Sequence, residues 1–293
     1  MQNISKVVIP VAGHGTRSLP ASKNVPKEML PIYNKPVIQY VVEEAVRAGI
    51  HDVVFVTSKE KTALEDYFDH HLPLEEVLER TGKEELLKTV RELVEMVTVM
   101  SVRQKKQLGF GHAVLCAKSI VQNEPFAVMV GDDIILGEDS GLKQLIEIAQ
   151  KENKPVIGVM EVDPKMVYKY GIVAGNTRPD GIIEITDMVE KPSVEKAPSN
   201  MAIIGRYVLP PEIFDYLENS KPGYGGEIQL TDALNLLAKD RGMLAVPVKG
   251  RRFDAGDLLD FLSVNVYFAL QDPKMKEAMH SRLESLLKEF SNN

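Results

Sequence analysis

Apolar and polar positions in the first half of the chain form blocks that match strands and helices in turn. Four short apolar runs, rich in β-branched residues, have the continuous character of strands buried on both faces, and they cover residues 6–11, 52–57, 97–102 and 125–131. Residues 36–49 show helical spacing and end at Gly49, a residue type favoured just after a helix. This alternation predicts βαβ units and a mostly parallel sheet with helices on both sides.

The second half has a different pattern. Strand-like runs follow one another with few helices between them, at residues 155–162, 171–175, 181–191 and 201–209. We expect mixed or antiparallel strands here that extend the sheet. A helical pattern covers 225–240, a strand follows at 243–248, and the chain is helical from Leu258 onward. The highly charged stretch 69–96 also has helical spacing; a solvent-exposed helical pair is the simpler interpretation, and a subunit contact is the alternative.

These elements together predict a single α/β domain over residues 1–293. We expect a Rossmann-like, mixed but mostly parallel central sheet that is flanked by helices. The sequence has no repeat, low-complexity tract or linker that would divide it. Residues 257–293 form C-terminal helices that could either dock on their own domain or contact a second subunit.

Composition and charge exclude several classes of protein. The formal net charge of −7 argues against general nucleic-acid binding, which needs a basic face. The first residues lack the apolar core of a signal peptide, and no apolar run has the length of a membrane span. The single cysteine, Cys116, excludes an internal disulfide, and its apolar helical setting favours a buried thiol over a nucleophile. We therefore expect a cytoplasmic protein without a membrane or nucleic-acid partner.

A glycine-rich segment, VAGHGTRSLPASKNVPKEMLP, follows the first predicted strand. Such a turn after a buried strand usually holds a phosphate. The segment has no Gly-Lys pair of a P-loop, and Ser18 stands at the third glycine position of a dinucleotide fingerprint. Gly13 and Gly15 still allow backbone N–H groups to approach a ligand, and Arg17 offers a planar fork to phosphate oxygens.

This segment and the motifs after it resemble the sugar-1-phosphate nucleotidylyltransferases. GHGTRSLP matches the pattern G-x-G-T-R-x-x-P, and PASKNVPKEMLP with IQYVVEEA is similar to the bacterial UTP–glucose-1-phosphate uridylyltransferases. Further motifs follow in the order of that family: RQ…GFGHAV, VGDDI, YGIVAG, VEKP, SNMAIIGRYVL, GGEIQLTDAL and RRFDAGD. Val11, His14 and Ser18 depart from the residues common at their positions, and these departures bear on base preference and nucleotide affinity.

The resemblance implies a nucleotidyltransferase-type fold and a reaction. Residues 1–135 would form the nucleotide-binding half and residues 136–256 the sugar-phosphate-binding half. The implied reaction joins UTP and α-D-glucose 1-phosphate into UDP-glucose and pyrophosphate, by Mg²⁺-assisted in-line attack of the sugar phosphate on the α-phosphorus. Such transfer depends mainly on positioning and charge neutralisation. Relatives form homodimers or homotetramers, so the resemblance also implies a homo-oligomer.

The nucleotide side of the implied site lies in the first half. Arg17 is expected at the β- and γ-phosphates and Lys27 near the α-phosphate. Gln104 has an amide that both donates and accepts, which suits the edge of uracil. The implied nucleotide-binding residues are Ala12, Gly13, Gly15, Thr16, Glu28, Gln104, Gly109 and Gly111. A salt bridge to a neighbouring lysine would explain Glu28 equally well.

The metal and the sugar phosphate involve later motifs. Magnesium prefers hard oxygen ligands, and Asp132 is the implied ligand. Asp133, its neighbour on a strand, is expected to point to the opposite face and accept hydrogen bonds. Asp254 matches a late aspartate that ligates the metal directly, acts through water or is purely structural. The implied sugar-phosphate residues are Gly171, Glu190, Lys191 and Asn200, and the implied catalytic residues are Arg17, Lys27, Asp132 and Lys191.

Two other functions agree with the same motifs. A thymidylyl- or cytidylyltransferase acting on the same sugar phosphate would share most of the site. A catalytically silent regulatory homologue would keep the fold, but Lys27, Asp132 and Lys191 are all present. The sequence therefore favours the active uridylyltransferase.

Overall fold

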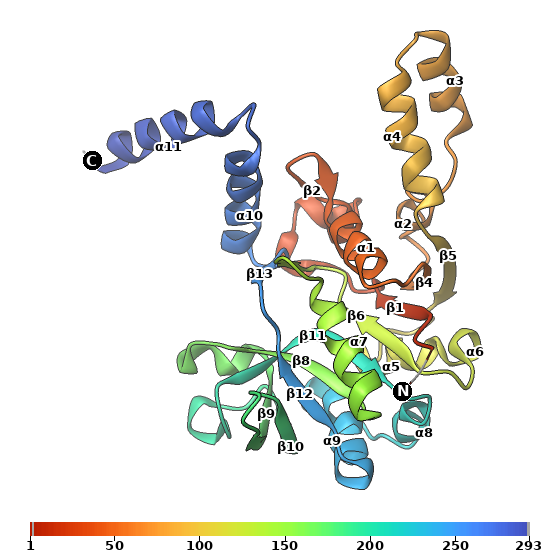
Figure 1. The fold of residues 1–293 in the computed structure, drawn as a ribbon, viewed down its shortest axis with the longest axis vertical. Helices are drawn as coiled ribbons and strands as arrows, with labels where there is room; N and C mark the ends of the chain where they lie inside the picture. The colour runs from red at the N-terminus through yellow and green to blue at the C-terminus, as the bar shows by residue number, and fades with distance from the viewer. Residues whose placement is uncertain (2, 292–293) are drawn as a thin grey trace.

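A nine-stranded sheet forms the centre of the computed structural model, which describes residues 1 and 3–291 (Figure 1). Its strands occur in the order β5 (Thr98–Arg103), β4 (Asp52–Thr57), β1 (Lys6–Pro10), β6 (Phe126–Met129), β11 (Met201–Leu209), β8 (Val156–Glu161), β12 (Leu244–Pro247), β10 (Ile183–Glu190) and β9 (Gly171–Thr177). The sheet therefore runs without a break through both halves of the sequence.

The sheet is mixed, and the prediction that it is mostly parallel was wrong. The pairs β5–β4, β4–β1 and β1–β6 are parallel, as the helix-connected first half predicts. Beyond β6, strand β11 is antiparallel to its neighbours β6, β8 and β9. Strand β10 is antiparallel to β12 and β9. Only β12 and β8 are parallel in this part of the described sheet. Antiparallel pairs need no crossover helix, which agrees with the strand-rich second half.

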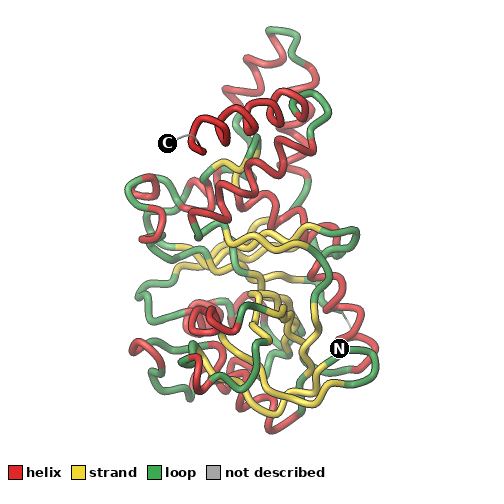
Figure 2. The backbone as a smooth tube through the Cα atoms, turned by 90° about the vertical axis from the view of Figure 1, so that its left-hand side faces the viewer, coloured by secondary structure: helices red, strands yellow, loops and turns green. Residues whose placement is uncertain are grey.

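Helices cover both faces of the sheet because the strands alternate between two apolar clusters. Val7 and Ile9 of β1 belong to one cluster and Val8 to the other. The first cluster includes apolar residues of α1 (Val37–Arg47) and α7 (Gly141–Glu152), and the second those of α5 (Phe110–Cys116), α8 (Ile213–Glu218) and α9 (Leu230–Arg241). Figure 2 shows the strands lying between helices. Strand β5 differs from the expectation for 97–102: it is an edge strand, and three of its six residues are exposed.

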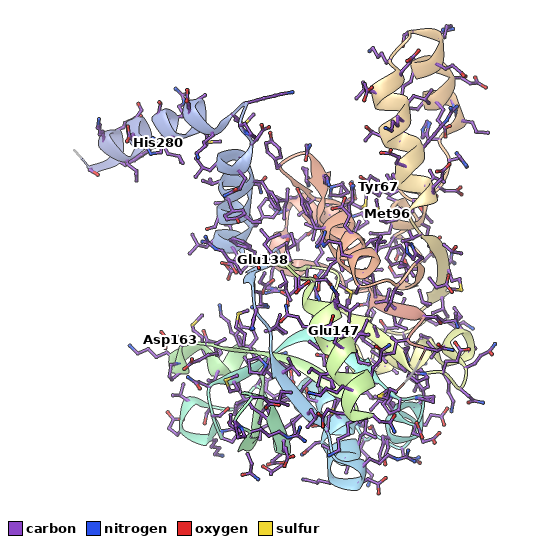
Figure 3. All side chains as sticks on the ribbon, in the orientation of Figure 1. Tyr67, Met96, Glu138, Glu147, Asp163 and His280 are labelled. Atoms are coloured by element: carbon purple, nitrogen blue, oxygen red, sulfur yellow. The ribbon has the colours of Figure 1, made fainter. Side chains whose placement is uncertain are left out.

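Two pairs of helices extend away from the sheet. Helices α3 (Leu72–Arg80) and α4 (Glu84–Glu95) confirm the helical pair expected within 69–96, and Figure 1 shows them projecting from the body. In Figure 3 the labelled Tyr67 and Met96 lie at the base of this pair, where both pack against the first apolar cluster. Helix α10 (Leu258–Gln271) continues into α11 (Lys276–Ser291), which has no buried residue over its described length.

The smaller elements position the loops around the sheet. They are β2 (Pro31–Ile32), β3 (Lys35–Pro36), α2 (Ala63–Asp66), α6 (Lys118–Val121), β7 (Asp133–Leu136) and β13 (Arg251–Asp254). Helix α9 begins later than the expected 225–240, because Gly225 and Gly226 have left-handed backbones that belong to a turn. No helix among the described residues is long and apolar enough to span a membrane.

Candidate active site

The glycine-rich segment leaves β1 and folds back on itself. Gly15 has a left-handed backbone with φ of 66°, and its carbonyl oxygen accepts a hydrogen bond from the Ser22 hydroxyl at 2.7 Å. A Cβ on Gly15 would lie 3.2 Å from Cβ of Lys27, so the two limbs of the segment pack closely. This return path brings Lys27 next to the end of β1, whereas Lys23 is exposed.

Two aspartates from distant parts of the sequence meet at this segment. Strands β7 and β13 pair in antiparallel register, with Asp133 opposite Asp254, and the Ala255 N–H donates to the Asp132 carbonyl at 2.8 Å. Asp132 itself lies in the turn between β6 and β7 rather than on a strand. The pairing of β7 with β13 therefore brings the carboxylates of Asp132 and Asp254 together beside the loop that holds Arg17.

Cations neutralise both carboxylates. The Lys27 ammonium contacts Oδ2 of Asp132, and the Arg17 guanidinium lies 3.2 Å from Asp254 and 3.7 Å from Asp132. Burial tends to raise the pKa of Asp132, but Lys27 and then Arg17 outweigh it and hold that pKa below its usual value. Burial tends to lower the pKa of Lys27, but the charges of Asp132 and Glu28 outweigh it and hold that pKa above its usual value. Lys27 and Asp132 are therefore both charged.

Asp133 has the separate role that its strand position predicts. Its carboxylate accepts two hydrogen bonds from the Arg252 guanidinium, at 2.7 and 3.0 Å. Burial raises the pKa of Asp133 to about 6, against the opposing charge of Arg252. The Arg252 guanidinium also lies 5.3 Å from the centre of the Tyr170 ring. The sequence analysis missed Arg252, which is opposite Ile135 in the register of β7 and β13 and reaches Asp133 diagonally across the strand pair.

A cavity of about 400 Å³ lies against the glycine-rich segment. Seven of the predicted nucleotide-side residues line it: Ala12, Gly13, Thr16, Lys27, Glu28, Gln104 and Gly109. The Gln104 amide is mostly buried, and its Nε2 donates to the Gly109 carbonyl at 3.1 Å. Gln107, which the sequence analysis missed, donates to the Ala12 carbonyl at 2.7 Å and so ties the wall of this cavity to the segment.

Gly15 and Gly111 do not line the cavity, but both shape it. The Gly111 N–H donates to the Ile228 carbonyl at 2.9 Å, and a Cβ on Gly111 would lie 2.8 Å from that oxygen. Gly109 has φ of 108°, and a Cβ there would lie 2.7 Å from Cβ of Glu227. These two glycines let the start of α5 approach the segment before α9.

A second cavity, of about 620 Å³, adjoins the first. Gly171, Glu190 and Lys191 line it together with Arg17 and Asp254, and Asp132 lines both cavities. Asn200 lines neither: its amide donates to Glu161 at 2.9 Å. Tyr207 is buried and also lines the second cavity. The predicted residues therefore gather around two chambers that meet at Asp132.

Lys191 has an unusual backbone within this second cavity. Its φ is 46°, a left-handed value that residues with a Cβ rarely adopt, and its N–H donates to the Tyr170 carbonyl at 2.9 Å. The ammonium lies 3.6 Å from Glu190 and 5.5 Å from the centre of the Tyr224 ring. Strain of this kind persists where the surroundings impose it and is frequent at ligand sites. The conformation holds Lys191 at the wall of the cavity.

The donor set at the junction fits a magnesium ion bound together with substrate. Among the described residues no group of three or more histidine, cysteine, aspartate or glutamate side chains is arranged to hold a metal. Asp132 and Asp254 nevertheless present hard carboxylate oxygens at the junction, and their side chains are 14% and 17% exposed. Magnesium usually binds one or two carboxylates and completes its coordination with water and substrate phosphate. Two carboxylates are therefore sufficient for this ion.

The chain is similar over its whole length to known nucleotidyltransferases. The family model described as nucleotidyl transferase matches residues 6–270. The UTP–glucose-1-phosphate uridylyltransferase of Staphylococcus haemolyticus is 48% identical over 286 residues, which cover 98% of this chain and 99% of the relative. A second such enzyme, from Staphylococcus saprophyticus subsp. saprophyticus, is 47% identical over 293 residues, which cover 100% of this chain and 100% of the relative.

Solved structures give the same result. A UDP-glucose pyrophosphorylase complexed with UDP-glucose has a TM-score of 0.85 at 43% identity, covering 92% of this chain and 100% of the other. A UTP-bound UGPase from Acinetobacter baumannii has a TM-score of 0.89 at 41% identity, covering 97% of this chain and 100% of the other.

Proposed function

The chain belongs to the nucleotidyl transferase family and, within it, to the UTP–glucose-1-phosphate uridylyltransferases, and we propose that it converts UTP and α-D-glucose 1-phosphate into UDP-glucose and pyrophosphate. The observation that carries this proposal is the meeting of two cavities at Asp132, where Lys27 and Arg17 supply positive charge. One chamber suits a nucleotide and the other a sugar phosphate. Their junction is where the two substrates would react.

The first cavity takes UTP in this proposal. The backbone of residues 12–16 borders the nucleoside, and the Gln104 carbonyl oxygen would accept from the uracil N–H, while its Nε2 is held by the Gly109 carbonyl at 3.1 Å and lies 3.0 Å from Nδ1 of His112. Lys27 and Arg17 neutralise the charge of the triphosphate, as transfer reactions of phosphate esters require. Both cations are positioned by carboxylates before substrate binds, so little reorganisation is needed.

The second cavity takes glucose 1-phosphate. Lys191 would pair with its phosphate, and Glu190, which accepts a hydrogen bond from Thr231 at 2.7 Å, would accept from sugar hydroxyls. An oxygen of the sugar phosphate attacks the α-phosphorus in line with the bond to the β-phosphate. That bond breaks as the new one forms, and pyrophosphate leaves. The attacking phosphate is already ionised at neutral pH, so no side chain needs to act as a base.

Asp132 and Asp254 would hold Mg²⁺ in this arrangement. The ion supplies charge neutralisation at the phosphate oxygens on which negative charge accumulates. Arg17 contacts both carboxylates in the structure and keeps them near one another. Gly256 permits this approach, because a Cβ on it would lie 2.5 Å from the Arg17 guanidinium and 3.0 Å from Asp132.

A substrate matrix tests the proposal. Purified protein is incubated with Mg²⁺ and each of UTP, dTTP, CTP and ATP, against glucose 1-phosphate and galactose 1-phosphate, and pyrophosphate release is measured. We expect the UTP and glucose 1-phosphate pair to give the highest kcat/KM. A preference for dTTP or CTP, or no turnover with any pair, would refute the assignment.

The protein is also proposed to act in the cytoplasm as a homo-oligomer. Helix α11 has no buried residue over its described length, and in Figure 3 its labelled His280 lies far from the sheet. Because most helical stability in proteins comes from packing of an apolar face, an additional contact would stabilise this helix. Leu287 and Phe290 are about 70% exposed, at 68% and 72%, and suit an apolar contact with a second copy. Sedimentation of the wild type and of Leu287→Asp tests this, and equal monomeric masses would exclude it.

A further inference from the structure

A buried lysine–glutamate pair lies beside the nucleotide cavity and has no part in the reaction described above. Lys61 is 7% exposed and Glu28 1% exposed. The Lys61 ammonium donates to both carboxylate oxygens of Glu28, at 2.8 and 3.2 Å. Lys61 belongs to the turn between β4 and α2, and its own N–H donates to the Ser58 carbonyl at 3.3 Å. The lysine thus reaches Glu28 from a separate element.

Glu28 is held from more than one side. It lies on the wall of the cavity that also contains Ala12, Thr16 and Gln104, next in sequence to Lys27. A Cβ on Gly131 would lie 3.3 Å from Cγ of Glu28, so the backbone before Asp132 packs directly against this side chain. Lys61 and Gly131 together leave the carboxylate little freedom to move.

Charge explains why the cavity needs Lys61. Burial raises the pKa of Glu28, and the nearby charges of Lys61 and Lys27 oppose this shift. Burial also lowers the pKa of Lys61, which the Glu28 carboxylate opposes. An unpaired carboxylate at this wall would repel the triphosphate and would lose its charge more readily. Paired with Lys61, it adds no net charge to the cavity.

The chemistry of the nucleotide indicates what Glu28 meets. A carboxylate only accepts hydrogen bonds. The phosphates of UTP are acceptors at neutral pH, so the donors available to Glu28 are the ribose hydroxyls and the uracil N–H. Glu28 therefore suits the nucleoside part of UTP and not its triphosphate.

We propose that Lys61 is a positioning residue for UTP binding: it holds both carboxylate oxygens of Glu28, so that this side chain presents a fixed acceptor to the nucleoside and no net charge to the triphosphate. The inference rests on the proposed function, because it assigns UTP to the first cavity. It adds a residue that touches neither substrate. Its effect should appear in UTP binding and hardly in the chemical step.

A double-mutant cycle tests this with Lys61→Met, Glu28→Gln and the double variant. Lys61→Met is expected to raise the KM for UTP about tenfold, the loss expected for a charged hydrogen bond, with the KM for glucose 1-phosphate unchanged within about twofold. In the Glu28→Gln background, Lys61→Met should change the UTP KM by less than about twofold, because Lys61 acts through Glu28. Lys6→Met removes a lysine–glutamate pair at the surface, with Glu124 at 2.6 Å, and should leave all constants unchanged.

The outcomes separate this inference from the proposed function. If wild-type protein lacks uridylyltransferase activity, the proposed function fails. If wild-type protein is active but Lys61→Met alters only the melting temperature, or alters the constants for both substrates equally, Lys61 is merely structural. If Lys61→Met does not fold, Glu28→Gln is compared with the uncharged double variant, and a difference in UTP KM above about twofold overturns the proposal.

Discussion

The Arg17 guanidinium donates to Oδ2 of Asp254 at 3.2 Å, although 237 positions separate the two residues in the sequence. Arg17 comes from the loop after the first strand and Asp254 from β13, the last strand of the chain. Asp132, 3.7 Å from the same guanidinium, completes the contact. These contacts join residues from the beginning, the middle and the end of the sequence at one point. The carboxylates of Asp132 and Asp254 are the first groups to test there.

Replacing Asp132 by asparagine should reduce Mg²⁺-dependent kcat/KM by about 10² or more, because the amide carries no charge to hold the ion. The substitution keeps the size of the side chain but removes the charge that the Lys27 ammonium contacts, so the melting temperature is measured alongside the rate. Measurement of rate against Mg²⁺ concentration checks this, with exposed Asp139→Asn as the control. Near-wild-type activity would remove Asp132 from the metal site.

Asp254→Asn distinguishes direct from indirect action of the second aspartate. If Asp254 ligates the ion directly, the Mg²⁺ concentration that gives half-maximal rate should rise about tenfold, comparable to the loss of one charged interaction. If Asp254 only holds Arg17, the KM for UTP should rise while the Mg²⁺ dependence stays constant. Steady-state kinetics at varied Mg²⁺ and UTP separates the two.

Lys191→Met should weaken binding of glucose 1-phosphate and leave that of UTP unchanged. Lys191 lines only the second cavity, and loss of its charged hydrogen bond corresponds to about 10- to 100-fold in kcat/KM. Initial rates at varied concentrations of each substrate measure the effect. The prediction is contradicted by an equal rise in both KM values. Lys165→Met, at an exposed position nearby in sequence, serves as the control.

Arg206 and Glu44 form a fully buried ion pair, with N–O distances of 2.7 and 3.0 Å, and the Arg206 guanidinium also donates to the Asp133 carbonyl at 2.7 Å. Arg206→Met alone should destabilise the fold by about 3–5 kcal/mol, because it leaves a buried carboxylate without a partner. The double variant Glu44→Gln, Arg206→Met should recover much of this loss. Urea unfolding of the wild type and the two variants measures both values. A double variant as unstable as the single one would show that the arginine acts by packing.

Cys116 should react slowly with alkylating agents. The side chain is partly buried rather than fully buried as expected, and burial raises the pKa of its thiol. Because the thiolate is the reactive form, a raised pKa means less thiolate at any given pH than in free cysteine. At about pH 8, iodoacetamide should label the native protein more slowly than urea-unfolded protein, as mass spectrometry can follow. Equal rates would contradict the burial of the sulfur.

The local pattern of apolar and polar residues was sufficient to predict most of the helices and strands. Strands β4 and β11 have the bounds that their apolar runs predicted, and α1 ends before Gly49, whose φ is 85°. These features depend on neighbouring residues, and the periodicity records them directly. The start of α9 was missed because the turn at Gly225 and Gly226 interrupts a helical pattern that continues in sequence.

Motifs also identified which residues would form the site, and most of them line the two cavities. Gly15, Gly111 and Asn200 do not line either cavity: the two glycines shape the backbone beside the first one, and the Asn200 side chain is engaged by Glu161. Roles in catalysis, nucleotide binding and metal binding stay predictions until the variants above are measured.

The sequence by itself determined the strands of the central sheet, most of the helices and the family, because all three depend on local patterns of residue type; the short strands β2, β3, β7 and β13 were not predicted. Only the tertiary structure decided that the sheet is mixed, that Arg17 meets Asp254, and that Lys61 holds Glu28. These relationships depend on strand order and on contacts between distant segments. The physical reason is that charges and hydrogen bonds act through space, and the spacing along a chain does not record which segments the packed core brings together.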